Sequence, residues 1–96
     1  MTRKAIQLLI EGKVQGVGYR AWTKRTAESL GLFGWVRNLT DGRVEIHAEG
    51  DAKALKTLTA ACEQGPRYAE VLQVQIAERP DWNLIEFEQV ATVSPP

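Results

Sequence analysis

Three glycines and an arginine lie close together near the start of the chain. Gly12, Gly16 and Gly18 belong to a segment, GKVQGVGYR, that ends at Arg20. Glycine permits backbone conformations that turn successive N–H groups toward one anion, and a guanidinium presents a planar pair of donors to two phosphate oxygens. The segment therefore predicts an anion-binding loop. The alternative is a tight turn in which Arg20 pairs with a surface carboxylate.

Two kinds of nucleotide loop can be set aside for this segment. Residues 16–21 formally match the dinucleotide pattern G-x-G-x-x-G/A. That fold continues with parallel strands, whereas Asp41-Gly42 lies between two strand-like runs and is typical of an antiparallel hairpin. A Walker loop needs Gly-Lys-Ser/Thr, which the segment lacks.

Asn38 is a second candidate for chemistry at this loop. Its side-chain amide can both donate a hydrogen bond to a water molecule and accept one from it. Alternation along residues 35–39 places Asn38 on the same strand face as Val36, where it can approach the loop if the two strands are close. The alternative, which is commoner for this residue type, is an asparagine that satisfies the backbone of the turn at residues 40–42.

The elements that position these residues follow from the apolar pattern. Alternation predicts strands at residues 5–11, 35–39, 43–49, around Leu72, Val74 and Ile76, and around Ile85 and Phe87. Good helix formers at 21–30 end at Gly31, and a second helix follows a cap at Asp51 and stops at Gly65-Pro66.

This order predicts an α+β fold, a ferredoxin-like βαββαβ sandwich with a short extra strand, in which two helices cover one face of an antiparallel sheet. At 96 residues the chain fits a single domain over 1–96. The fold serves enzymes, metal carriers and RNA-binding proteins alike, so it does not decide function.

Composition excludes several classes of partner. Twelve basic and twelve acidic residues give no net charge, and no apolar stretch is long enough to span a bilayer, so we expect a soluble protein that binds neither nucleic acid nor membrane. Residues 44–48 lack the aromatic side chains of an RNA-binding sheet. A lone Cys62 excludes an internal disulfide and favours a cytoplasmic protein, and with a single distant His47 it cannot form a metal site.

Five side chains receive structural interpretations. Cys62 is expected to be a buried, inert thiol on the second helix, and His47 a solvated residue on the outward face of its strand. Trp22 and Trp35 are expected to fill the space between the first helix and the sheet or to flank the site. Trp82 is expected to begin the last strand, partly exposed.

Two segments of the chain resemble the signatures of the acylphosphatase family, G-x-V-Q-G-V-x-[FY]-R followed by G-x-V-x-N and D-G-x-V. The first is GKVQGVGYR at residues 12–20, and the second is GWVRNLTDGRVE at residues 34–45. The resemblance extends over nearly the whole chain. It implies a hydrolase that cleaves the carboxyl–phosphate bond of small acyl phosphates to a carboxylate and inorganic phosphate.

The resemblance also implies roles for individual residues. The backbone amides of Gln15, Gly16, Val17, Gly18, Tyr19 and Arg20, together with the Arg20 guanidinium, would hold the phosphoryl group, and Asn38 would orient the attacking water. The substrate's own phosphate would accept the water's proton, inorganic phosphate would act as product and inhibitor, and the monomeric protein would need no metal or other cofactor. The alternative is a non-catalytic acylphosphatase-like module that binds an anion or a partner. The main departure from the family pattern, Arg67-Tyr68-Ala69 after Gly65-Pro66, lies outside both signatures.

Overall fold

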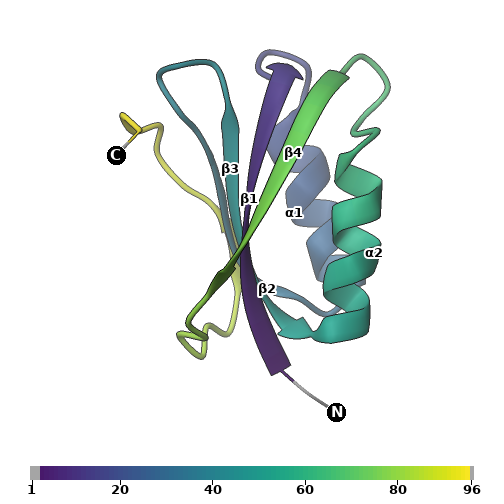
Figure 1. Cartoon of the computed structure of the whole chain (residues 1–96), viewed down its shortest axis with the longest axis vertical. Coiled ribbons are helices and arrows are strands. Elements are labelled where there is room, and N and C mark those ends of the chain that lie inside the picture. Colours follow the sequence, from purple (N-terminus) through teal and green to yellow (C-terminus); the bar gives the residue numbers. More distant parts are fainter. Residues whose placement is uncertain (1–2, 96) are drawn as a thin grey trace.

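The computed structural model describes residues 3–95, which form a five-stranded sheet with two helices on one face (Figure 1). The order of strands across the sheet is β4-β1-β3-β2-β5. The elements are β1 (Arg3–Lys13), α1 (Tyr19–Ser29), β2 (Phe33–Asn38), β3 (Val44–Asp51), α2 (Ala52–Cys62), β4 (Glu70–Arg79) and β5 (Phe87–Gln89). The predicted ferredoxin-like βαββαβ fold is confirmed, with the extra strand at its end. No helix of this described region is long and apolar enough to cross a membrane.

The four long strands pair antiparallel, as predicted, but the short extra strand does not. β1 pairs with β3 and with β4, and β2 pairs with β3, all antiparallel, whereas β5 runs parallel to β2. Figure 1 shows the reason: the chain leaves β4 at one end of the sheet and crosses to the opposite edge at that same end. A strand that begins there must run in the direction of β2.

The first helix begins two residues earlier than the sequence predicts. Gly18 is its N-cap residue and adopts a left-handed conformation with φ of 79°, so that Tyr19 rather than Ala21 opens the helix. The helix ends as expected, because Gly31 takes the left-handed conformation, with φ of 71°, that reverses the chain. This early start places Arg20 inside the first turn.

The second helix packs the apolar face that the sequence predicts. Leu55, Leu58 and Cys62 are buried against the sheet. Asp51 is the N-cap residue, but its side chain makes no capping hydrogen bond, so the predicted side-chain cap is wrong. The change from a strand pattern to a helix pattern shows where the helix begins. A capping hydrogen bond requires in addition a particular rotamer of the Asp51 side chain.

β4 departs from simple alternation because of a bulge. Gly12 pairs with Val71 and Glu11 pairs with Gln73, which leaves Leu72 without a partner on β1. Val71 and Val74 therefore pack against the core, while Leu72 is 81% exposed. The predicted inward alternation of Leu72, Val74 and Ile76 is wrong at Leu72, and Ile76 also stays exposed because β4 is an edge strand.

His47 is buried, so its prediction as a solvated surface residue is wrong. The imidazole lies between the indole rings of Trp35 and Trp82, with ring-centre distances of 5.7 Å and 4.2 Å, and its exposed fraction is 1%. Trp35 thus stacks on His47 rather than filling space beneath the first helix, whereas Trp22 packs against the core as predicted. Trp82 is half exposed, as predicted, but it lies in the crossing segment before β5.

The crossing segment is fastened to the sheet by Glu49. This fully buried carboxylate accepts hydrogen bonds from the backbone N–H groups of Trp82, at 2.6 Å, and Leu84, at 2.9 Å. It also lies 2.7 Å from His47 Nε2 and accepts from Arg3 at 2.9 Å. Burial acts to raise the pKa of Glu49, but the hydrogen bonds from His47, Trp82 and Leu84 outweigh it and hold the pKa below its usual value. Arg3 also donates to Asp81 and to the Leu84 carbonyl, so Glu49 and Arg3 together hold the crossing segment against the sheet.

Candidate active site

The loop between β1 and α1 borders a cavity of about 220 Å³. Gly16 and Gly18 both have positive φ, 75° and 79°, which lets the loop curl back toward the start of α1. The lining residues come from this loop, from the first turn of α1, from the end of β2 and from β5: Val14, Gln15, Gly16, Gly18, Tyr19, Arg20, Ala21, Asn38 and Gln89. The structure thus brings Arg20 and Asn38, which are far apart in the sequence, to one cavity.

The loop presents a run of backbone donors without protein partners. Within residues 3–95, no backbone N–H group from Gln15 to Ala21 donates to a carbonyl or a side chain, and the first such bond is from Trp22 to the Gly18 carbonyl at 3.0 Å. Backbone donors in native proteins are nearly always satisfied by protein, water or ligand. The N-terminus of α1 is the positive end of the helix dipole, which adds further attraction for an anion at this loop. The arrangement suits an anion that accepts several hydrogen bonds at once.

Val17 and Tyr19 direct their side chains away from the cavity. Val17 does not line it and packs partly against the core. Tyr19 is buried, and its hydroxyl donates to the Cys62 carbonyl at 2.7 Å, while burial raises the pKa of the phenol. Burial likewise raises the pKa of the Cys62 thiol to about 12. Tyr19 can therefore take part in binding only through its backbone, whereas Val17 is the one residue of Gln15–Arg20 that does not line the cavity. Cys62 is a buried thiol, as predicted.

Arg20 forms no ion pair with any carboxylate of residues 3–95. The helix dipole disfavours a cation in the first turn of α1, so an unpaired guanidinium at this position needs an external anion or solvent. This geometry favours the anion-binding interpretation of Arg20 over pairing with a surface carboxylate.

Asn38 does not serve the adjacent turn. Asp41 does so instead, because its carboxylate accepts hydrogen bonds from the backbone N–H of Arg43 at 3.1 Å and from the Arg43 side chain at 2.9 Å. Within residues 3–95, Asn38 Oδ1 is the one buried side-chain polar atom without a hydrogen-bond partner. Leaving a buried acceptor unsatisfied is costly, so this amide, which lines the cavity, is a candidate for a functional rather than a structural role.

Gln15 has a side-chain role that sequence reasoning missed. Its Nε2 donates to the backbone carbonyls of Leu39, at 2.8 Å, and Arg43, at 2.9 Å. These two carbonyls belong to the hairpin between β2 and β3, next to Asn38. The amide therefore joins the loop directly to the strand end that carries Asn38. No pattern in the sequence identifies such a long-range contact.

Gln89 was also missed, because its place depends on the direction of β5. Gly34, Trp35 and Val36 of β2 pair in parallel with residues 87–89, so Gln89 lies beside Val36 and close to the cavity. Within residues 3–95, no group of three or more His, Cys, Asp or Glu side chains is arranged to hold a metal ion.

Comparison with known proteins identifies the family. A model of the family Acylphosphatase matches residues 6–88. The acylphosphatase of Marinobacter nauticus is 55% identical over 80 residues, which cover 83% of this chain and 87% of that protein. The acylphosphatase of Methylococcus capsulatus is 52% identical over 75 residues, which cover 78% of this chain and 82% of that protein. The match to a crystal structure of acylphosphatase from Bacillus subtilis covers 93% of this chain and 99% of that protein chain, with a TM-score of 0.88 and 34% sequence identity.

Proposed function

The chain belongs to the acylphosphatase family, and we propose that its backbone amides from Gln15 to Arg20, with the Arg20 guanidinium, hold the phosphoryl group while Asn38 orients the attacking water. The protein is a hydrolase of acyl phosphates. The observation that carries the assignment of roles is the run of unpartnered N–H groups bordering the cavity that Arg20 and Asn38 also line.

The proposed reaction transfers a phosphoryl group to water. The oxygen of the water forms a bond to phosphorus, the bond between phosphorus and the acyl oxygen breaks, and its electron pair leaves with the carboxylate. The carboxylate is a good leaving group, so no strong general acid is required. One proton of the water passes to the substrate's own phosphate. Such a transition state needs mainly charge stabilisation and in-line positioning, which fixed amides and a guanidinium supply.

Asn38 is suited to hold the water because its amide offers both a donor and an acceptor. Asn38 lines the cavity, so its amide can bind the water there and direct a lone pair of the water oxygen toward phosphorus. The non-catalytic alternative has no comparable support, because a module that only binds an anion has no need of an unpartnered amide beside its donors.

The experiment is hydrolysis of acetyl phosphate in water enriched in ¹⁸O, with EDTA present. Attack on phosphorus places the label in inorganic phosphate and none in acetate. We expect turnover with this labelling, and we expect Asn38→Ala to lower the rate. Label in acetate would overturn attack on phosphorus, and turnover that requires added Mg²⁺ would overturn the metal-independent proposal.

The proposal extends to the setting in which the protein works. We propose a monomer that acts as one domain in the cytoplasm, with inorganic phosphate as its product and competitive inhibitor. The anion-binding loop supports the inhibition, and the lone, buried Cys62 fits a reducing compartment. The proposed domain includes residues 1, 2 and 96, which lie outside the described region.

A further inference from the structure

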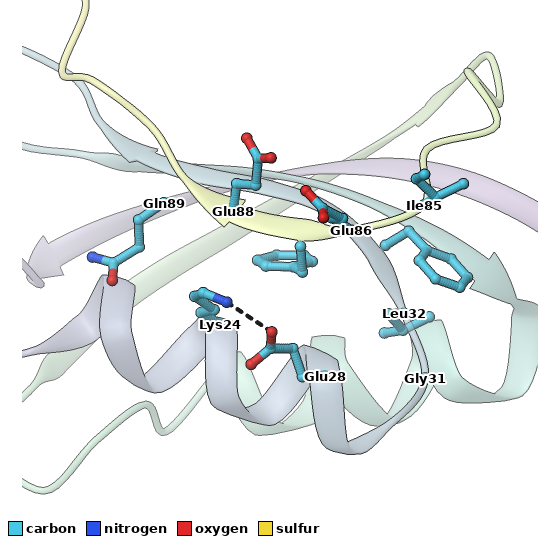
Figure 2. Close-up of a pocket in the computed structure, with 10 residues that line it drawn as sticks. Lys24, Glu28, Gly31, Leu32, Ile85, Glu86, Glu88 and Gln89 are labelled. Carbon is cyan, nitrogen blue, oxygen red and sulfur yellow. Dashed lines mark hydrogen bonds and ion pairs between the residues drawn. The ribbon is translucent and has the colours of Figure 1, made fainter.

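A groove of about 600 Å³ lies beside the candidate active site, between α1 and the segment that contains β5 (Figure 2). Its apolar part is formed by Leu32, Phe33 and Phe87, and Lys24 and Glu28 stand along its α1 side. Small-molecule sites in proteins commonly have volumes of 300–1,000 Å³, to order of magnitude. The groove is thus of the size of a ligand site, and nothing in the proposed phosphate chemistry uses it.

The groove adjoins the cavity of the active site. Gln89 lines both. On the facing helix, Ala21 lines the cavity, and Lys24 and Glu28 line the groove at spacings that keep all three on one side of α1. At 1.5 Å per residue, Lys24 stands roughly 5 Å and Glu28 roughly 10 Å along the helix from Ala21. A molecule bound at the loop therefore lies next to the groove, with Gln89 at the boundary between the two.

We propose that the acyl group of the substrate extends from the phosphate loop past Gln89 into this groove, and that the groove selects acyl groups without a second negative charge. This inference rests on the proposed function, because it requires the phosphoryl group to be bound at the loop. The cavity at the loop, about 220 Å³, can hold a phosphate and a small acyl group, so bulkier acyl groups must leave it.

The charge around the groove supports this selectivity. Lys24 pairs with Glu28 at 2.7 Å, so these two side chains neutralise each other. Glu86 and Glu88 also border the groove and form no ion pair with other residues of 3–95. In Figure 2 their carboxylates rise from the β5 side, away from α1. They therefore act on a ligand through their electrostatic field rather than by contact, and the field opposes a second anionic group.

The test compares three substrates: acetyl phosphate, which stays in the cavity; benzoyl phosphate, which enters the groove; and 4-carboxybenzoyl phosphate, which carries a negative charge into it. The quantity measured is the ratio of kcat/KM for the charged and uncharged aromatic substrates. We expect the double variant Glu86→Gln, Glu88→Gln to raise this ratio about fivefold at low ionic strength, since one charge acting at ~7 Å through water changes it two- to threefold. Added salt should reduce the effect.

A matched control removes two carboxylates from the opposite edge of the sheet. Glu70→Gln, Glu78→Gln makes the same charge change on β4, which is separated from β5 by three strands, or roughly 19 Å. All four residues are exposed, so we expect both proteins to fold, which circular dichroism verifies. If both double variants change the ratio equally, or neither changes it, the groove proposal is wrong. If no acetyl phosphate is hydrolysed, the proposed function fails as well.

Discussion

The side-chain amide of Gln15 donates to the backbone carbonyl of Leu39 at 2.8 Å, which fastens the phosphate loop to the strand end beside Asn38. A second bond from the same nitrogen reaches the Arg43 carbonyl. The proposed phosphate site and the proposed water site are therefore held at a fixed separation by one side chain. Phosphoryl transfer depends steeply on such positioning.

Replacing Gln15 should lower the rate of hydrolysis more than it weakens the binding of phosphate. Gln15→Met keeps the length of the side chain but removes the donor, so we expect kcat to fall about tenfold or more while phosphate inhibition changes little. The carbonyls of Leu39 and Arg43 each lose one of two donors, and two lost hydrogen bonds should lower the free energy of unfolding by about 1–3 kcal/mol. The measurements are steady-state kinetics and urea unfolding, with exposed Gln73→Met as the control.

The variant Gln15→Glu tests whether the side chain positions the phosphate loop through its hydrogen bonds or only fills space. Above the pKa of the introduced carboxyl the side chain cannot donate, and its charge faces two carbonyl oxygens. Below that pKa its O–H can donate again, so activity relative to the parent should recover as the pH falls toward about 4. A relative activity that does not change with pH would show that Gln15 only fills space.

Arg20→Gln should abolish turnover and weaken binding together. The change removes a charge-assisted, bidentate contact with phosphate, whose loss we expect to cost at least roughly 1.5–3 kcal/mol in phosphate binding. The inhibition constant for inorganic phosphate measures this directly. Parent-like phosphate binding in a folded variant would contradict the assigned role.

Asn38→Ala should lower turnover while leaving the binding of phosphate almost unchanged. The loop amides and Arg20 remain, so phosphate should bind almost as well as in the parent, while turnover falls by on the order of a hundredfold or more. Inhibition and turnover are measured side by side, after thermal melts confirm folding. Normal turnover would remove Asn38 from the mechanism even though the family is established.

Cys62→Ser should leave turnover intact. The thiol belongs to the buried face of α2, and burial raises its pKa to about 12, so it is neither exposed nor ionised at neutral pH. We expect a modest loss of stability, because a more polar hydroxyl replaces the thiol in an apolar site. Loss of most activity in a folded protein would show that this interpretation is mistaken.

Glu49 should make stability depend on pH in the acid range. Its pKa is lowered in the folded protein, so the unfolded chain takes up a proton first as the pH falls. The stabilisation is therefore fully present above the ordinary pKa of about 4.3 and is lost as the pH falls through the lower, folded-state value. Urea unfolding at pH 7 and pH 3 should show a smaller pH dependence for Glu49→Gln than for the parent.

The sequence predicts the parts of this protein that depend on local patterns. Alternating apolar residues identify the strands, Asp41-Gly42 identifies the hairpin, and Gly31 marks the end of α1. Arg20 and Asn38 were identified as candidates because their residue types suit the proposed chemistry. Their meeting at one cavity follows from the topology that these local patterns imply.

Long-range side-chain contacts explain what the sequence could not predict. The burial of His47 depends on Trp82 lying over the far face of the sheet, which in turn depends on Glu49 binding the backbone of the crossing segment. The bulge at Leu72 arises from pairing between two distant strands. Such contacts leave no periodic signal in either segment.

The parallel course of β5 has a consequence for how the protein is made. Synthesis proceeds from the N-terminus, so the loop, Arg20 and Asn38 leave the ribosome well before Gln89. A nascent chain that ends within β4 already contains the four antiparallel strands and the phosphate loop. It lacks Gln89, which lines both the cavity and the groove, so the proposed selectivity for the acyl group can arise only after β5 has been synthesised.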